Sequence, residues 1–165
     1  MEIYLIRHTT PAVAKGICYG QSDLDVTATF TSEAAVIQQC IPARVTAVYS
    51  SPLKRCKILA EHLYAAHPIQ LHHELKEINC GKWEMQLWDD IPKQEIEPWM
   101  NDLINVPIPG GESYQELFER VRDWFGQIIS KHGSTAKELN SDAHPEAIVV
   151  VAHGGILRSI LSHIT

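Results

Sequence analysis

The sequence lacks the features that mark several large classes of protein. It holds no unbroken apolar run long enough to cross a membrane. The first residues show no basic segment followed by a long apolar stretch, as a secretory signal would, so we expect a cytoplasmic protein with no membrane partner. The formal net charge is −6 and no block of Lys and Arg occurs, which excludes the basic face that a nucleic-acid partner requires.

Cysteine and histidine occur without the spacing of a metal site. The four cysteines form no CxxC pair, and the sequence contains no HExxH motif. His72 and His73 are adjacent in a predicted strand, so their side chains point to opposite faces. We therefore expect reduced thiols, no metal ion and no cofactor.

The composition and the apolar runs indicate one globular domain over residues 1–165. Hydrophobic residues make up 45% of the chain, which can form a substantial core at this length. Three runs have the pattern of strands buried on both faces, and a fourth is weaker: 2–8, 45–51, 147–153 and 69–75. Helical stretches separate these runs. The alternation predicts a three-layer α/β/α sandwich with a mostly parallel central sheet.

Cap residues predict where the helices begin and end. Ser51-Pro52 would open the helix after the second run, and Thr31 or Ser32 would open a shorter one. Ser113 would begin a long helix that ends at Gly133. Residues 140–145 are polar and would connect this helix to the last strand.

Residues 83–109 do not follow the alternating pattern. They are rich in Trp, Pro and acidic residues, and we expect a lid-like insertion with short helical pieces. The aromatic residues in and beside it, Trp83, Trp88, Trp99 and Tyr114, either pack the lid onto the body or include one ring that stacks on a flat leaving group. Tyr19 is the other candidate for such a contact.

Arginine and histidine follow three of the predicted strands. Arg7-His8 ends the first, His153-Gly154-Gly155 follows the last, and Arg55 lies in the first turn of the helix after the second. Because the carboxyl ends of parallel strands meet at one edge of a sheet, these side chains should converge in one crevice.

The chemistry of these residues favours a phosphoryl group. Guanidinium groups fit phosphate oxygens, and an imidazole with an available lone pair is a nucleophile toward phosphorus. Gly154-Gly155 at a helix start would add backbone N–H donors. Glu77 is the best-placed carboxylate to give a proton to the leaving alcohol, although Glu74 and Glu84 lie close by.

Six segments of the chain resemble the histidine phosphatase superfamily, also called phosphoglycerate-mutase-like. They occur in the order typical of the family and span almost the whole sequence. They are residues 7–10 (RHTT), 19–20 (YG), 50–55 (SSPLKR), Glu77 with 81–84 (GKWE), 110–113 (GGES) and 152–155 (AHGG).

The resemblance implies a phosphatase that is phosphorylated on His8. Arg7, Arg55 and His153 would bind the phosphoryl oxygens, and Glu77 would act first as general acid and then as the base that activates water. The matching segments also suggest substrate contacts from Thr9, Thr10, Tyr19, Gly20 and Gly154. Residues 18–23 (CYGQSD) look most like those of alpha-ribazole phosphatases, which remove phosphate from alpha-ribazole 5′-phosphate late in cobalamin assembly.

The chain departs from the family pattern at several points. Relatives usually have Gly where this chain has Thr9, an acidic or amide residue at Thr10, and Asn at Ala14. A hydroxyl of Thr9 or Thr10 would then replace those contacts. Relatives usually continue into a further strand beyond the position of Thr165, so this is either a shortened version or a chain without its C-terminal part.

Two other functions remain open from the sequence. A phosphoglycerate-mutase-type isomerase must retain a bisphosphate, usually with longer basic insertions, whereas the lid carries Lys82 and Lys93 but no arginine. A non-catalytic phospho-ligand binding module would lack the nucleophile or the acid. We therefore expect a phosphomonoesterase acting on a small-molecule phosphate ester. Glu112 either touches the site or lies beside the helix that Ser113 opens, and the oligomeric state is left open.

Overall fold

A parallel sheet forms the centre of the computed structural model, which describes residues 1–135 and 147–164. Within these ranges four strands pair in the order β1-β4-β2-β3. They are β1 (Glu2–Arg7), β2 (Ala47–Ser50), β3 (Ile69–Leu71) and β4 (Ala147–Ala152). All four predicted strands are confirmed, each shorter than its apolar run. The register pairs Arg7 with Ala152 and Val151 with Ser50, so the carboxyl ends of β1, β4 and β2 lie side by side.

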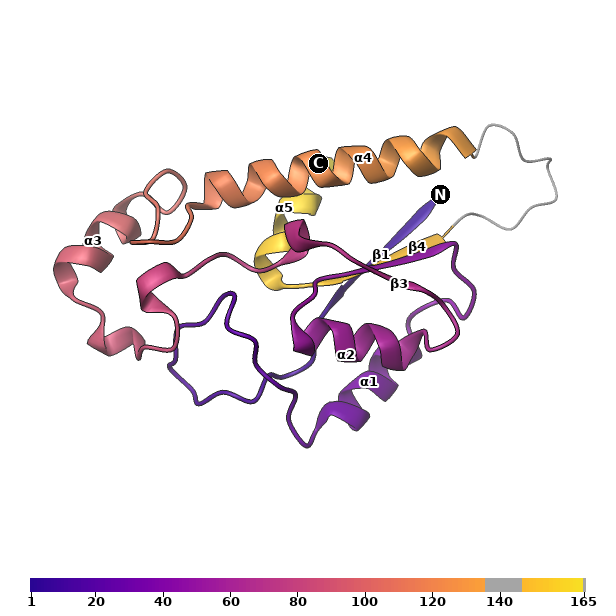
Figure 1. Cartoon of the computed structure of the whole chain (residues 1–165), viewed down its shortest axis with the longest axis horizontal. Helices are drawn as coiled ribbons and strands as arrows, with labels where there is room; N and C mark the ends of the chain where they lie inside the picture. The colour runs from indigo at the N-terminus through magenta and orange to yellow at the C-terminus, as the bar shows by residue number, and fades with distance from the viewer. Residues whose placement is uncertain (136–146, 165) are drawn as a thin grey trace.

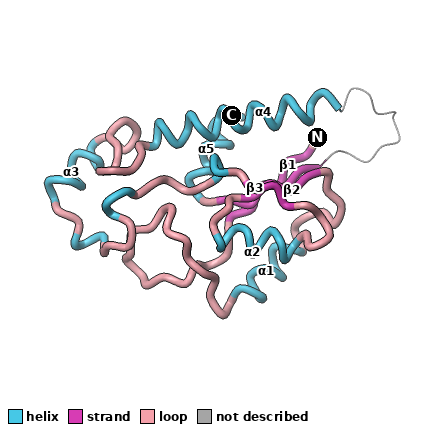
Figure 2. The backbone as a smooth tube through the Cα atoms, in the orientation of Figure 1, coloured by secondary structure: helices cyan, strands magenta, loops and turns pink. Residues whose placement is uncertain are grey.

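Helices cover both faces of this sheet. The helices α1 (Phe30–Gln38) and α2 (Lys54–Leu63) lie on one face, and α4 (Tyr114–Thr135) and α5 (Gly154–Ile164) lie on the other (Figures 1 and 2). Strand β4 is buried throughout, with Val149 and Val151 in the core against α1 and α2 and Ile148 and Val150 in the core against α4 and α5. The predicted three-layer α/β/α sandwich is confirmed.

Helix α2 begins two residues later than Ser51-Pro52 predicts. The Ser51 hydroxyl accepts a 3.3 Å hydrogen bond from the Leu53 N–H, and Leu53 is still extended. The N–H of Lys54, the first helical residue, donates to the carboxylate of Asp23 at 2.7 Å. Because this cap comes from a distant loop, the local pattern does not reveal it.

The other helix ends agree in part with the prediction. Helix α1 begins at Phe30, just before the expected Thr31 or Ser32. Helix α4 follows Ser113 as predicted, and Ser113 and Glu116 form a reciprocal capping box with N–H to oxygen distances of 3.2 and 2.7 Å. It does not end at Gly133 but continues to Thr135, because Gly133 does not adopt the positive φ of a helix-ending glycine. The predicted connection at residues 140–145 lies outside the described residues.

Residues 83–109 lie beyond the start of α4, at the end of the molecule where α3 (Lys93–Asn101) is labelled (Figure 1). Two short 3₁₀ turns, η2 (Gly81–Trp83) and η3 (Trp88–Asp90), precede α3, which agrees with the expected short helical pieces. Trp83 is fully buried and its Nε1–H donates to Glu95 at 2.9 Å. Trp88 stacks on Trp99 with ring centroids 6.0 Å apart. The lid role of this segment stays a prediction. Among the described helices, none is both long and apolar enough to span a bilayer.

Candidate active site

Three strand ends meet around two histidines. The His8 N–H donates to the Ala152 carbonyl at 3.1 Å, which joins the end of β1 to the end of β4. The Ser51 N–H donates to the Val151 carbonyl at 3.0 Å, which joins the end of β2 to the same strand. His153 follows β4 directly, and its ring centroid lies 5.1 Å from that of His8. Residues 145 positions apart in the chain are thus brought into contact by the parallel register.

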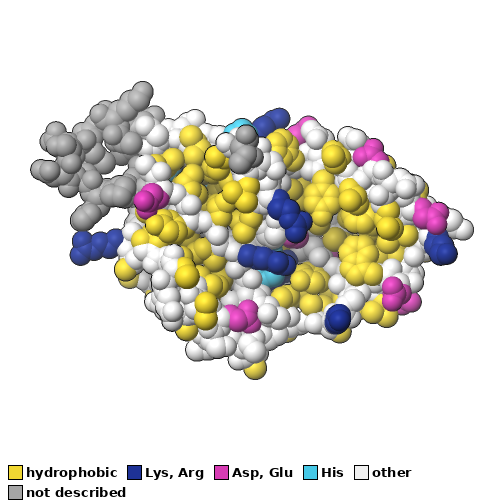
Figure 3. Space-filling view, turned by 180° about the vertical axis from the view of Figure 1, so that it is seen from behind, with side chains coloured by type: hydrophobic (Ala, Val, Ile, Leu, Met, Phe, Trp, Pro, Cys, Tyr) yellow, Lys and Arg dark blue, Asp and Glu magenta, His cyan; other side chains and the backbone are white. Residues whose placement is uncertain are grey.

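A cavity of about 230 Å³ opens beside these histidines. Six of the predicted site residues line it: Arg7, His8, Tyr19, Arg55, Glu77 and Gly154. Tyr114, Trp88, Trp99 and Arg158 complete much of its wall. In Figure 3, Lys or Arg side chains lie next to a histidine in the middle of one face, with hydrophobic side chains on both sides. We call this cavity the phosphate cavity.

The hydrogen bond of His8 determines which ring nitrogen carries the proton. Nδ1 lies 2.7 Å from the Thr9 carbonyl oxygen, which can only accept, so Nδ1 is the protonated nitrogen. Burial lowers the pKa of His8 to about 4, with a further contribution from the charges of Arg55 and Arg7, while the bond to Thr9 opposes the change. The ring is therefore neutral near pH 7, and Nε2 keeps its lone pair.

His153 is completely buried behind His8. Its Nε2 lies 2.8 Å from the Ser51 hydroxyl and 3.4 Å from the Cys56 sulfur. Burial, followed by the charge of Arg55, holds the pKa of His153 well below its usual range. Burial also raises the pKa of the Cys56 thiol, which excludes a thiolate nucleophile at this position.

Arg55 is held rigidly beneath the cavity. Its side chain is fully buried, and its two terminal nitrogens donate to the carbonyls of Ser22 at 2.8 Å and Gly20 at 2.7 Å. A side chain at Gly20 would collide with the Ile78 carbonyl, so this approach of the backbone requires glycine. Gly20 therefore positions Arg55 through its carbonyl.

The positive charge of the cavity exceeds the negative charge in its lining, where Arg7, Arg55 and Arg158 stand against Glu77 alone. The guanidinium groups of Arg7, Arg55 and Arg158 form no salt bridge with a carboxylate in the part of the chain that the structure describes. The Nε of Arg55 is buried and has no hydrogen-bond partner among these residues. An anion bound here would balance the charge that these groups leave unpaired.

Glu77 is the acidic residue that lines the cavity. Its two carboxylate oxygens accept hydrogen bonds from the Ile78 N–H at 2.9 Å and the Gly155 N–H at 3.1 Å. The carboxylate fills the space where a side chain at residue 155 would stand, so any other residue there would displace Glu77 from its present position. Glu84 instead accepts from the backbone N–H groups of Gly20, Gln21, Ser22 and Cys80. Glu74 is exposed in the 3₁₀ turn η1 (His73–Leu75).

An ion pair outside the cavity holds the Glu77 segment in place. Arg120 donates to both carboxylate oxygens of Glu112, at 3.0 and 2.7 Å, and to the carbonyls of Glu74 and Glu77. Glu112 also accepts from the Asn79 N–H at 2.8 Å. Glu112 does not line the phosphate cavity, and it directly precedes Ser113 at the start of α4, where the Ser113 N–H donates to Glu116. Glu112 fixes the loop that carries Glu77.

Removing this ion pair should therefore lower the stability of the protein. Arg120→Ala leaves the Glu112 carboxylate partly buried without its partner, and we expect the free energy of unfolding to fall by about 2 kcal/mol. That loss corresponds to a decrease in Tm of about 5 °C for a chain of this size. The matched control is Arg122→Ala, which removes an exposed pair with Asp123. Equal Tm values for the two variants in thermal unfolding would contradict this account.

Thr9 and Thr10 do not line the phosphate cavity. The Thr9 hydroxyl is buried and has no partner among residues 1–135 and 147–164. Thr10 is exposed, and both its N–H and its hydroxyl donate to Glu33, at 2.9 and 3.1 Å. Their contact with substrate stays a prediction. The described residues contain no cluster of three or more His, Cys, Asp or Glu placed to hold a metal ion.

Comparison with known proteins establishes the family. The histidine phosphatase superfamily (branch 1) matches residues 3–165. The chain belongs to this superfamily. It is therefore an enzyme of the histidine phosphatase type, and the phosphoglycerate-mutase-like fold expected from its sequence is confirmed.

The relatives of this histidine phosphatase carry several different names. It is 33% identical to the metal-independent phosphoserine phosphatase of Arabidopsis thaliana, over 99% of this chain and 68% of the relative. It is 32% identical to a probable phosphoglycerate mutase of Salmonella choleraesuis, over 99% and 74%. The crystal structure of a putative alpha-ribazole-5′-P phosphatase from Escherichia coli superimposes with a TM-score of 0.79 at 26% identity, covering 95% of this chain and 75% of that one.

The sequence analysis of this histidine phosphatase did not predict that Arg120 and Arg158 matter for the site. It also did not predict that Glu84 anchors the loop at residues 20–22. Arg158 lies one helical turn after Gly154, so the spacing along α5 places both on one face. That spacing was the available signal for Arg158. Glu84 lies in the family-like segment 81–84, but its contact with residues 20–22 is far away in the sequence and so has no local signal. No comparable signal marks Arg120.

Proposed function

We propose that this histidine phosphatase hydrolyses a small-molecule phosphate monoester through a phosphohistidine at His8. The observation that carries the proposal is the hydrogen bond from Nδ1 to the Thr9 carbonyl, which leaves the Nε2 lone pair of a neutral ring beside the phosphate cavity. Nε2 attacks phosphorus, the bond to the ester oxygen breaks, and Glu77 donates a proton to the departing alkoxide. Water then attacks the phosphohistidine, Glu77 takes a proton from this water, and inorganic phosphate leaves.

The remaining residues of the cavity stabilise charge during these steps. Arg7 and Arg55 bind the phosphoryl oxygens, and the N–H of Gly154, at the start of α5, adds the positive end of the helix dipole. The resemblance also assigns a phosphoryl contact to His153, which is buried behind His8 and would have to turn its Nε2 away from the Ser51 hydroxyl to donate to a phosphoryl oxygen. Rigid placement of these donors lowers the barrier because they need no reorganisation during transfer.

We propose alpha-ribazole 5′-phosphate as the substrate. Residues 18–23 resemble the corresponding segment of alpha-ribazole phosphatases, and the Escherichia coli structure of that name has the same fold. The aromatic side chains of Tyr19, Trp88 and Tyr114 line the phosphate cavity and would suit a flat leaving group better than a short polar one.

A comparison of phosphate esters tests this substrate. We expect kcat/KM, measured by release of inorganic phosphate, to be at least about tenfold higher for alpha-ribazole 5′-phosphate than for O-phosphoserine or 3-phosphoglycerate. The reverse order would contradict the substrate. Isomerisation of 3-phosphoglycerate without phosphate release would instead indicate a mutase, and tight binding of all three esters without turnover would indicate a binding module.

A further inference from the structure

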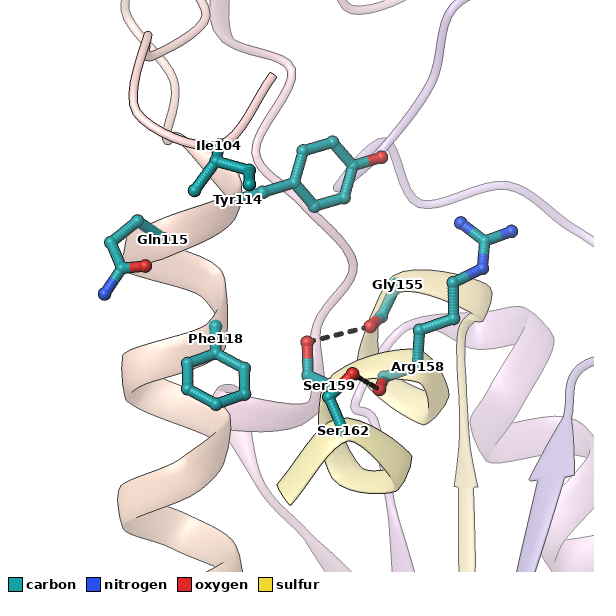
Figure 4. Close-up of a pocket in the computed structure, with 8 residues that line it drawn as sticks. All are labelled: Ile104, Tyr114, Gln115, Phe118, Gly155, Arg158, Ser159 and Ser162. Carbon is teal, nitrogen blue, oxygen red and sulfur yellow. Dashed lines mark hydrogen bonds between the residues drawn. The ribbon is translucent and has the colours of Figure 1, made fainter. Parts of the chain in front are cut away.

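A second cavity, of about 370 Å³, lies between α4 and α5 next to the phosphate cavity. One side is formed by Ile104, Tyr114, Gln115 and Phe118, and the other by Gly155, Arg158, Ser159 and Ser162 (Figure 4). We call it the α4–α5 groove. Tyr114, Gly155 and Arg158 line both cavities, so the two cavities are adjacent at this junction.

The two sides of the groove differ in chemistry. The α4 side presents the rings of Phe118 and Tyr114, with Ile104 beside them (Figure 4). Ile104 is 59% exposed although it is apolar, and the Gln115 N–H fixes its backbone by donating to the Ile104 carbonyl at 3.0 Å. A fixed, exposed apolar wall of this kind is suited to a flat apolar group.

The α5 side is polar, and it carries one full charge, on the guanidinium group of Arg158. The hydroxyls of Ser159 and Ser162 donate to the carbonyls of Gly155 and Arg158, at 3.0 and 2.9 Å, so both are held against α5 (Figure 4). The Arg158 guanidinium and the Tyr114 hydroxyl extend toward the same side of the groove (Figure 4). The guanidinium groups of Arg158 and Arg7 lie near each other. Each has an atom 3.9 Å from the position that a Cβ at residue 154 would occupy. Acidic side chains are absent from the lining, which consists only of described residues.

We propose that the α4–α5 groove binds the leaving group of the substrate and selects nucleoside-like phosphate esters. This inference rests on the proposed function, which places the phosphoryl group at His8. A polar sugar would then lie at the junction, within reach of the donors of Arg158 and Tyr114, and a flat aromatic base would lie against Phe118 and Ile104. The phosphate cavity alone, at about 230 Å³, is smaller than the roughly 300–1,000 Å³ of most small-molecule sites.

The contribution of the base can be measured with two esters that differ only in that group. Alpha-ribazole 5′-phosphate carries the base, and ribose 5-phosphate lacks it, so the ratio of their kcat/KM values reports binding of the base. Phe118→Ala removes the ring on which the base would lie, and we expect the ratio to fall about tenfold. Ser162→Trp adds bulk to the groove without removing a core contact, and it should lower the ratio to a similar extent.

Leu161→Ala is the matched control, because it truncates an exposed apolar side chain of α5 that does not line the groove. Its ratio should equal that of the unmodified protein. The proposal is overturned if the ratio is unchanged in Ser162→Trp and in a folded Phe118→Ala, with folding judged by Tm. Turnover of ribose 5-phosphate by His8→Asn would contradict the proposed function itself, so the two failures are distinguishable.

Discussion

Replacing His8 with Asn lowers kcat for p-nitrophenyl phosphate by at least about four orders of magnitude, if His8 is the nucleophile. Asn can still donate a hydrogen bond to the Thr9 carbonyl, so the surrounding loop keeps its main contact. It has no ring nitrogen to form a bond with phosphorus. The remaining arginines would bind the substrate without an attacking group, and KM should change far less than kcat.

The control for this variant is His73→Asn, which makes the same substitution at an exposed histidine outside the phosphate cavity. It should keep full activity. Both variants should unfold at the Tm of the unmodified protein, which separates loss of chemistry from loss of fold. A folded His8→Asn protein with more than about a tenth of normal turnover would exclude His8 as the essential nucleophile.

Glu77→Gln should slow the hydrolysis of alkyl phosphates by about 10²- to 10⁴-fold. Gln can still accept one of the two backbone hydrogen bonds that hold Glu77, from Ile78 or Gly155, but it cannot give a proton to the departing alkoxide. The loss should be much smaller for p-nitrophenyl phosphate, because p-nitrophenolate leaves without protonation. The dependence on leaving group is the signature of a general acid.

Glu74→Gln is the matched control, since Glu74 is a nearby exposed carboxylate that does not line the cavity. It should have normal rates with both kinds of ester. An equal loss for alkyl and p-nitrophenyl phosphates in Glu77→Gln would contradict the role of proton donor and leave Glu77 only as a residue that orders the start of α5.

The sequence predicted the central sheet because strands buried on both faces have no polar alternation. Residues 147–152 are all buried, and a run such as AIVVVA is compatible with little else. The convergence of His8 and His153 followed from the same argument, because parallel strands bring their carboxyl ends to one edge. This part of the site depends on the order and direction of the strands, and the positions of apolar residues in the sequence predict both.

The contacts that orient these residues could not be predicted. The cap of α2 comes from Asp23, the loop at residues 20–22 is held by Glu84, and the Glu77 segment is held by Arg120. Each joins residues more than 30 positions apart, and their polar side chains look like ordinary surface residues in the sequence. Gly133 shows the opposite case, in which a residue typical of helix ends remains inside a helix because the backbone keeps helical angles.

The most direct test of the account is to locate the phosphate during turnover. The protein is mixed with p-nitrophenyl phosphate, quenched in alkali within milliseconds, and digested for mass spectrometry. The account predicts an acid-labile, alkali-stable phosphate on the peptide that contains His8, formed and lost at rates that match turnover. Phosphate on any other residue, or active turnover with no protein-bound phosphate at any quench time, would contradict it.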